Sequence, residues 1–247
     1  MILCHTITGG ALAADVQVAV ASNFMLPLQN LGAQFEARTG DRLLISPGST
    51  GGLYAQIVNG APFDVLLAAD AERPRLLVRE ELAVAGSRST YARGRVVLYS
   101  ADGAGAHDAG SDAGCLARLN ALAFKRLAIA NPKIAPYGIA ARDILRKLGL
   151  WKDLRHNLVR GENIAQTFQW VESGNASLGL VALSQVVLKG QGKGCRWIVP
   201  ETYHKPLEQQ LVLLAAGEDN PAAHRFIAFV LSQKTKAEIR RMGYLVD

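Results

Sequence analysis

Small hydroxyl residues, prolines and glycines occupy four short turns of the sequence, each directly in front of a stretch with helical periodicity. These turns are residues 21–23, 47–52, 135–138 and 161–164. A helix N-terminus offers backbone N–H groups without intrahelical partners, together with the positive end of the helix dipole. The hydroxyl groups of Ser22 and Ser49 add donors that can turn toward a bound ion. The chemistry that this pattern favours is the binding of a small anion by uncharged donors.

Each turn taken alone has an explanation that needs no ligand. Ser22, Ser49 and Asn163 are residue types that commonly cap helices, and Pro136 suits a first helical turn. The glycines of residues 47–52 are not followed by the Lys of a Walker loop, and G-x-G-x-x-G does not occur there. A site is indicated because both halves of the chain offer such turns at expected strand ends, where a cleft would bring them together.

Two successive alternations of strands and helices must position these turns. The first contains expected strands at 16–22, 43–46 and 63–68, with helices at 24–38 and 53–58. The second has expected strands at 94–100, 127–130, 157–159, 178–182 and 196–199, a loop at 101–114, and helices at 139–148 and 164–173. An extended run at 208–215 and helices at 222–232 and 236–242 follow. The pattern is typical of an α/β protein with two lobes and a cleft between them.

The composition sets outer limits on the function. The 247 residues are 49% hydrophobic and 19% charged, which excludes a disordered chain, and no apolar run is long enough for a membrane-spanning helix. The net charge of +6 permits an anionic partner. Nucleic-acid binding is not predicted, because neither a helix-turn-helix pattern nor interleaved aromatic and basic residues occur.

The N-terminal residues and the cysteines point to an exported protein. Residues 1–14 contain no Lys, Arg, Asp or Glu, and Ala11-Leu12-Ala13 fits a signal-peptidase site, so we interpret them as the remnant of a signal peptide. The alternatives are a start further upstream or a frayed N-terminus. Removal of Cys4 with the signal would leave Cys115 and Cys195, either as a disulfide or as two independent buried residues.

Enzymatic chemistry has little support in the sequence. The five histidines are scattered, without metal-ligand spacing, and no G-x-S-x-G turn occurs. Asp64 and Asp70 lie at opposite ends of one expected strand, so we interpret them as structural. An enzyme on the same fold remains the less favoured alternative, and no cofactor is expected.

Five segments, in this order, resemble the molybdate-binding proteins of bacterial ABC importers. They are residues 16–24, 48–51, 63–70, 136–140 and 178–181, and the resemblance extends from residue 15 to the end. It implies a periplasmic-binding-protein-like fold of type II, in which two crossing strands join two α/β lobes. One lobe is expected at 15–93 plus 212–247 and the other at 94–211. It also implies a monomeric periplasmic receptor for molybdate or tungstate that docks on a membrane permease.

The resemblance also implies a ligand set. The hydroxyl and amide groups of Ser22 and Ser49, Asn23, and the amides of Tyr137 and Ile164 would contact the oxyanion oxygens and not the metal atom. Many family members add a tyrosine where this sequence has Ala182, so Asn23 or the segment around Tyr137 is expected to replace that contact.

Related functions stay open at this point. The Ser22 and Ser49 turns contain no carboxylate to receive the hydrogen of a protonated phosphate. Sulfate and thiosulfate receptors are alternatives, because sulfate needs the same donors as molybdate. An effector-binding lobe pair of a transcription factor would need a helix-turn-helix ahead of residue 15, and none is found there.

Overall fold

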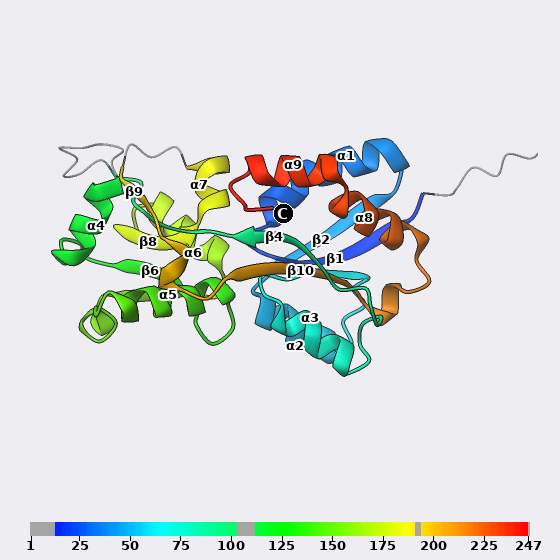
Figure 1. The fold of residues 1–247 in the computed structure, drawn as a ribbon, viewed down its shortest axis with the longest axis horizontal. Helices are drawn as coiled ribbons and strands as arrows, with labels where there is room; N and C mark the ends of the chain where they lie inside the picture. Colours follow the sequence, from blue (N-terminus) through cyan, green and yellow to red (C-terminus); the bar gives the residue numbers. More distant parts are fainter. Residues whose placement is uncertain (1–12, 103–111, 191–193, 247) are drawn as a thin grey trace, which may run out of the picture.

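Two α/β lobes lie side by side and give the molecule an elongated shape (Figure 1). The computed structural model describes residues 13–102, 112–190 and 194–246, so most of the expected signal remnant, with Cys4, lies outside the described residues. Each lobe is built on one five-stranded sheet. Across the described ranges, no helix combines the length and the apolar character needed to span a lipid bilayer.

The first sheet carries helices on both faces. Its strands, in spatial order, are β2 (Arg42–Gly48), β1 (Asp15–Ala21), β3 (Val65–Leu67), β10 (Leu207–Leu213) and β4 (Ser89–Gly94). The first three run parallel, and β10 is antiparallel to both neighbours. One face packs on α1 (Met25–Thr39), α8 (Pro221–Leu231) and α9 (Gln233–Arg241), and the other on α2 (Thr50–Val58) and α3 (Glu72–Arg79). The β1–α1 and β2–α2 turns therefore lie together at the carboxyl ends of adjacent parallel strands.

The second sheet repeats this arrangement. Its order is β7 (Leu158–Gly161), β6 (Leu127–Ala130), β8 (Leu178–Ala182), β5 (Val96–Tyr99) and β9 (Arg196–Ile198). Helices α4 (Asp112–Asn120) and α5 (Pro136–Lys147) cover one face, while α6 (Ile164–Glu172) and α7 (Leu183–Lys189) cover the other. Three short 3₁₀ turns lie at Asp153–His156, Glu201–Tyr203 and Ala215–Gly217.

The chain crosses between the lobes twice. One crossing leads from β4 into β5, and the other returns from β9 to β10. This is the expected type II arrangement of two α/β lobes and two crossing strands. All of β10 pairs within the first sheet, so the boundary expected at 212 falls inside that strand and the return lies before Leu207. The sequence of residues 208–215 did not show where the chain crosses between the lobes, because a strand keeps the same apolar alternation whether or not it follows a crossing.

Most expected elements are present, and four others were missed. Helix α3 has only Pro74 and Leu77 buried, so its helical face carried little hydrophobic signal. Helix α4 follows the Gly- and Ala-rich segment that was expected to be a loop to residue 114, and it begins earlier, at Asp112. Helix α7 follows β8 without a break, and β4 precedes β5 with one residue between them. Short elements joined without a turn residue leave no boundary in the sequence.

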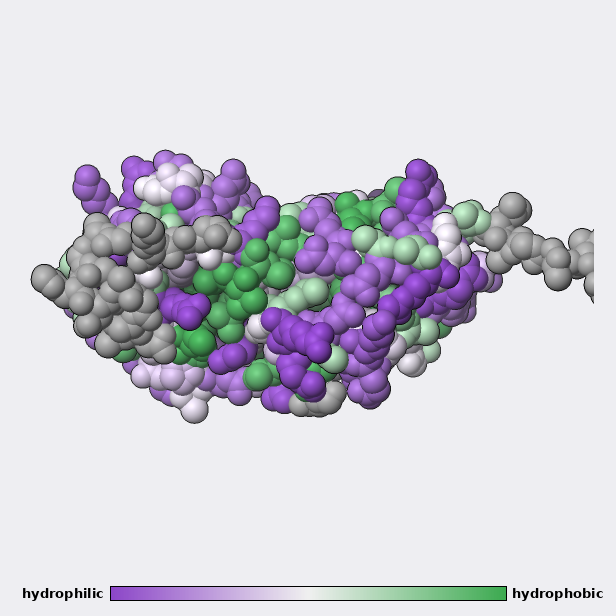
Figure 2. All heavy atoms as spheres, turned by 90° about the horizontal axis from the view of Figure 1, so that it is seen from above, coloured by the Kyte–Doolittle hydropathy of each residue, from purple (hydrophilic) through white to green (hydrophobic). Residues whose placement is uncertain are grey.

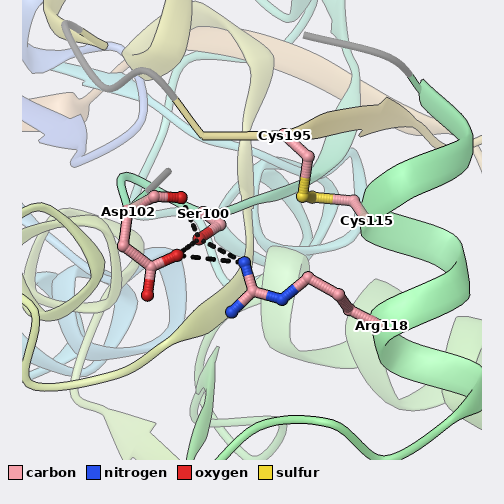
Figure 3. Close-up of a disulfide and its surroundings, with 5 residues drawn as sticks. All are labelled: Ser100, Asp102, Cys115, Arg118 and Cys195. Carbon is pink, nitrogen blue, oxygen red and sulfur yellow. Dashed lines mark hydrogen bonds and ion pairs between the residues drawn. A yellow bond between two sulfur atoms is a disulfide. The ribbon is translucent and has the colours of Figure 1, made fainter. Parts of the chain in front are cut away.

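A disulfide and a polar cluster hold the outer end of the second lobe. Cys115 on α4 and Cys195 beside β9 are joined, with Cα atoms 5.2 Å apart (Figure 3). Next to it, the Arg118 guanidinium donates to the Ser100 hydroxyl at 3.1 Å and to the Asp102 carboxylate at 3.0 Å. Together these contacts tie α4 to the edge of the sheet, far from the first lobe.

The surface is polar over most of its area. Figure 2, a view onto the face that carries α7 and α9 in Figure 1, shows hydrophilic residues around a band of hydrophobic ones near the middle. Val187 on α7 is 47% exposed and is among the large apolar side chains that reach solvent.

Candidate functional site

A small cavity lies between the lobes, where the strand-to-helix turns of both sheets meet. It brings together all five residues that the sequence predicted: Ser22, Asn23, Ser49, Tyr137 and Ile164. The other lining residues are Ala21, Gly48, Thr50, Ala69, Ala135 and Pro136. The cavity is small: the volume open to the centre of a water molecule is only about 10 Å³. The cavity suits an ion of a few atoms better than a sugar or an amino acid.

Two serine hydroxyls belong to the first-lobe wall of the cavity. Ser49 is the N-cap of α2, yet its side chain makes no capping hydrogen bond. Ser22 stands ahead of the N-cap of α1, which is Phe24, and its hydroxyl has no hydrogen-bond partner among the described residues. A Cβ atom on residue 52 would lie only 2.9 Å from Ser49 Oγ, so the glycine at this position avoids a clash with the Ser49 hydroxyl. Both hydroxyls are therefore available to a ligand.

The Ser22 backbone amide corrects one expectation. It donates to the Gly48 carbonyl at 2.9 Å, because the parallel pairing of β1 and β2 continues one residue past Ala21. An amide has a single hydrogen, so the Ser22 amide is not a ligand donor in this arrangement. The Ser22 hydroxyl keeps its predicted place.

Two second-lobe amides face the serines. In α5 the Ala135 carbonyl accepts from Gly138 and Ile139, which leaves the first-turn amide of Tyr137 without an intrahelical acceptor. In α6 the Asn163 side chain accepts from Ala165 N and Gln166 N, each at 3.0 Å. The Asn163 cap does not use the amide of Ile164, which therefore lacks an intrahelical acceptor, as the amide of Tyr137 does. Asn163 is thus the structural cap that the sequence suggested, beside a free amide.

Gln185 links Ala182, at the end of β8, to Ile164, at the start of α6. Its Oε1 accepts from the Ala182 amide at 3.1 Å, and its Nε2 donates to the Ile164 carbonyl at 3.1 Å. Ala182 is fully buried and is not part of the cavity wall described above. Gln185 therefore fixes the N-terminus of α6 against the end of β8 without itself lining the cavity.

A buried polar cluster surrounds Asn23. Its Nδ2 donates to Gln209 Oε1 at 2.8 Å and to the Tyr244 hydroxyl at 3.0 Å, and its carbonyl accepts from Tyr244 at 2.9 Å and from Ser184 at 3.2 Å. Gln209 continues the cluster, accepting from Tyr91 at 3.1 Å and donating to the Tyr137 hydroxyl at 3.4 Å. Sequence reasoning missed Gln209, Tyr244 and Ser184, because they come from distant elements and carry no local motif.

The site carries no formal charge, but the helix dipoles that point at it make its electrostatic potential positive. None of the lining residues named above carries an ionisable acid or base except the Tyr137 phenol. Burial raises the pKa of Tyr91 and Tyr137 well above the ordinary tyrosine value, and burial likewise raises that of Tyr244. All three phenols therefore stay neutral near neutral pH. The positive ends of α1, α2, α5 and α6 remain as the local field, which favours an anion.

Hydrogen bonds across the cleft hold the lobes together around the cavity. The Gly51 amide on α2 donates to the Ile134 carbonyl of the second lobe at 2.9 Å. A Cβ atom at position 51 would lie 2.7 Å from that oxygen, so a glycine is needed for the approach. The Ser184 hydroxyl reaches the Asn23 carbonyl from the second lobe. In the described geometry the two lobes are therefore in direct contact beside the cavity.

The described parts of the structure contain no cluster of side chains suited to a metal ion, and the two carboxylates considered in the sequence have partners. Within those ranges, no group of three His, Cys, Asp or Glu side chains could hold a metal ion. Asp64 accepts from the Gln17 amide, and Asp70 pairs with Arg73 at 2.9 Å. Burial raises the pKa of Asp70, against the opposing effect of Arg73. Both carboxylates have structural partners, in line with their interpretation from the sequence.

The chain is similar to known bacterial proteins over almost its whole length. A family model described as bacterial extracellular solute-binding protein matches residues 16–245. The molybdate-binding protein ModA of Azotobacter vinelandii is 48% identical over 235 residues, which cover 95% of this chain and 91% of that protein. ModA of Rhodobacter capsulatus is 40% identical over 237 residues, covering 96% and 90%.

A solved structure shares the fold. The periplasmic molybdate-binding protein of Azotobacter vinelandii superposes with a TM-score of 0.85 at 36% sequence identity, over 94% of this chain and 99% of that one. These findings confirm the resemblance on which the sequence-based expectations rest.

Proposed function

Because the chain belongs to the family of bacterial extracellular solute-binding proteins, we propose that it is the molybdate- and tungstate-binding receptor of an ABC importer. The observation that carries this proposal is the meeting of uncharged donors from both lobes at one small cavity. The ligand donors are the hydroxyls of Ser22 and Ser49 and the amides of Tyr137 and Ile164, with Asn23 beside them in the cavity wall. They bind the oxygens of the oxyanion and leave the metal atom without a protein ligand.

The donor set matches a fully deprotonated dianion. Such an ion offers only acceptors, and the hydroxyl and amide groups named above can all donate to it. A protonated phosphate carries its own hydrogen, and the lining residues provide no carboxylate to accept it. Sulfate has the same charge and the same donor requirement, so its discrimination rests on the size of the closed cavity. The names of the 48% and 40% identical relatives support molybdate.

The fold supplies a mechanism for capture and release. Ser22 and Ser49 belong to one lobe, Tyr137 and Ile164 to the other, and two crossing strands connect them. A ligand that touches both walls stabilises the closed state over the open one, which is a population shift driven by contacts made fully only on closure. The protein performs no reaction. It acts as a monomer in the periplasm and presents its closed face to a membrane permease.

A thermal-shift panel tests the ligand class. Molybdate, tungstate, sulfate, thiosulfate and phosphate are added separately to the protein at the same concentration. We expect a large rise in the unfolding temperature with molybdate and tungstate only, since tight binding to the folded state stabilises it by about 4 kcal/mol at 1,000 times the dissociation constant. A rise with sulfate or thiosulfate alone would assign the receptor to the alternative anion, and no rise with any of the five would contradict the proposal.

A further inference from the structure

The Tyr137 side chain of the second lobe lies against a glycine of the first. This glycine is Gly94, the last residue of β4 before the chain crosses into β5. A Cβ atom on residue 94 would meet the Tyr137 hydroxyl and would lie only 3.1 Å from the ring carbon Cζ. The φ angle of Gly94 is not positive, so its backbone conformation is open to other residues. Glycine is therefore needed at this position for the space that it leaves to the phenol.

The Tyr137 phenol reaches both strands that adjoin the crossings between the lobes. Gly94 on β4 pairs with Leu207 at the start of β10, and the two strands lie side by side where the lobes meet (Figure 1). The side-chain amide of Gln209, two residues further along β10, lies 3.4 Å from the Tyr137 hydroxyl. Tyr137 is 2% exposed and Gln209 is fully buried. The hydroxyl thus fills an enclosed space between the two crossings.

A single residue therefore connects the anion cavity with the strands about which the lobes would rotate. The amide of Tyr137 is in the first turn of α5, at the cavity, and its phenol lies at the crossings. An aromatic ring cannot shorten, and this ring is packed on all sides. Any rotation that brings α5 nearer to the first lobe would press the phenol into Gly94.

We propose that the contact of the Tyr137 phenol with Gly94 limits how closely the lobes approach, and so sets the size of oxyanion that the cavity accepts. This inference rests on the proposed function. Molybdate and sulfate need the same donors, and sulfate is the smaller tetrahedron. With the Tyr137 amide held at a fixed distance from the serine hydroxyls, sulfate cannot reach the donors of both walls at once. Tyr137 is a ligand donor through its amide and a specificity-determining residue through its phenol.

A second glycine contact holds the same segment of the second lobe. Three residues before Tyr137, the Ile134 carbonyl accepts from the Gly51 amide at 2.9 Å. The segment that leads into α5 is thus held against the first lobe at Gly51 and at Gly94, and it cannot tilt about either contact alone. The Gly51 contact is made by backbone atoms, whereas the phenol can be shortened by one atom through substitution. Tyr137 is therefore the position at which the distance between the lobes can be altered.

Calorimetric titration with molybdate, alone and in excess sulfate, tests the role of the phenol in the full chain. Tyr137→Phe removes the oxygen that meets Gly94, so we expect closer approach of the lobes and a fall in the preference for molybdate over sulfate of about fivefold or more. The matched control is Tyr99→Phe, which removes the hydroxyl of another buried second-lobe tyrosine. That hydroxyl donates to Glu172 at 2.7 Å, away from Gly94, and its loss is expected to leave the preference unchanged.

A pair of compensating substitutions tests the contact itself. Gly94→Ala adds a methyl group against the phenol, so we expect molybdate affinity to fall by about tenfold or more. Adding Tyr137→Phe to Gly94→Ala is expected to restore much of this loss, because the methyl group takes the place of the missing hydroxyl. General damage to the site would instead make the effects of the two substitutions add.

Urea unfolding of each variant establishes that it is folded before titration. Sulfate competition in Tyr137→Phe no stronger than in the natural protein, natural affinity in Gly94→Ala, or additive losses in the double variant would each overturn the inference and leave the receptor function in place. Tyr137→Phe adds no volume, so its sulfate competition decides the question by itself where Gly94→Ala does not fold. Absence of molybdate binding by the natural protein would overturn the proposed function itself.

Discussion

The two serine hydroxyls carry the residue-scale argument. A serine ahead of a helix usually turns its oxygen to the first-turn amides, and Ser232 does so in front of α9 by accepting from Thr235 N at 3.3 Å. Ser49 occupies the same position at α2 without such a bond. A hydroxyl that does not cap the helix contributes little to the stability of the fold, and it can donate to a ligand instead.

Ser49→Ala separates these two roles. We expect molybdate affinity to fall by about 1.5 to 3 kcal/mol, the value of a hydrogen bond to a charged group, with the free energy of unfolding of the ligand-free protein nearly unchanged. Ser22→Ala is expected to behave alike. Ser232→Ala is the control, with a stability loss of about 1 kcal/mol and unaltered affinity. Titration calorimetry and urea unfolding measure the two quantities. Unchanged affinity in both Ser22→Ala and Ser49→Ala would remove these hydroxyls from the site.

The helix starts carry the argument at the scale of elements. Strand β1 leads to Ser22 and β2 leads to Ser49, while β6 and β7 lead to the α5 and α6 starts in the other lobe. These four turns could be predicted from the sequence because hydrophobic periodicity changes from strand to helix across each of them. Their partners could not be, since Gln209 and Tyr244 reach Asn23 across 186 and 221 residues of chain.

Gly51 allows an element of one lobe to touch the other. Gly51→Ala places a methyl group against the Ile134 carbonyl, which belongs to the backbone and has no flexible side chain to yield. We expect incomplete closure and a loss of molybdate affinity of about 1 to 3 kcal/mol, the usual cost of overpacking. Small-angle scattering with molybdate present should show a larger radius than the natural protein gives. Gln56→Ala, on the exposed side of α2, is the control. Natural affinity in Gly51→Ala would show that this contact does not limit closure.

At the scale of the whole molecule, the sequence predicted the two lobes but not where the chain returns. Apolar alternation identified most strands of both sheets, because buried strands need it whichever lobe they join. The order of strands and the position of β10 in the first sheet depend on pairings between distant segments, such as Val212 with Leu66. The cysteine pair had two interpretations for the same reason, since spacing in the chain does not give distance in space.

The disulfide stabilises the second lobe without touching the cleft. It links residues separated by 80 positions, and a closed loop of that length reduces unfolded-chain entropy by an amount worth about 4 kcal/mol. A Cys115→Ser/Cys195→Ser variant is expected to lose about 2 to 4 kcal/mol of unfolding free energy and to bind molybdate with natural affinity. Urea unfolding and calorimetry check both statements. An affinity loss as large as the stability loss would mean that the outer end of the lobe shapes the site.

An ion pair between a buried carboxylate and a partly exposed arginine sets part of the pH dependence of stability. Asp41, with a side chain 1% exposed, accepts two hydrogen bonds from Arg225 at 2.8 and 2.9 Å. Hydrogen bonding from Arg225 is the main cause that lowers the pKa of Asp41 in the folded state. The stabilisation is therefore present above the unfolded pKa of about 3.9 and is lost as pH falls through the folded value.

Asp41→Asn should show this linkage. We expect a loss of about 2 kcal/mol at neutral pH and a smaller difference from the natural protein at an acid pH below the lowered folded pKa, where the carboxyl group is protonated. Urea unfolding at the two pH values measures it. A difference that stays constant between them would assign the loss to packing and not to the charge.

The central claim is that uncharged donors bind a fully deprotonated oxyanion, and calorimetry in two buffers of different ionisation enthalpy tests it most directly. Molybdate is titrated into the protein at neutral and at mildly alkaline pH. A site of hydroxyls, amides and neutral phenols predicts equal heats in the two buffers and an affinity independent of pH, because no proton moves on binding. Heats that differ between the buffers, with an affinity that changes across this range, would contradict the account and require an ionisable group at the ligand.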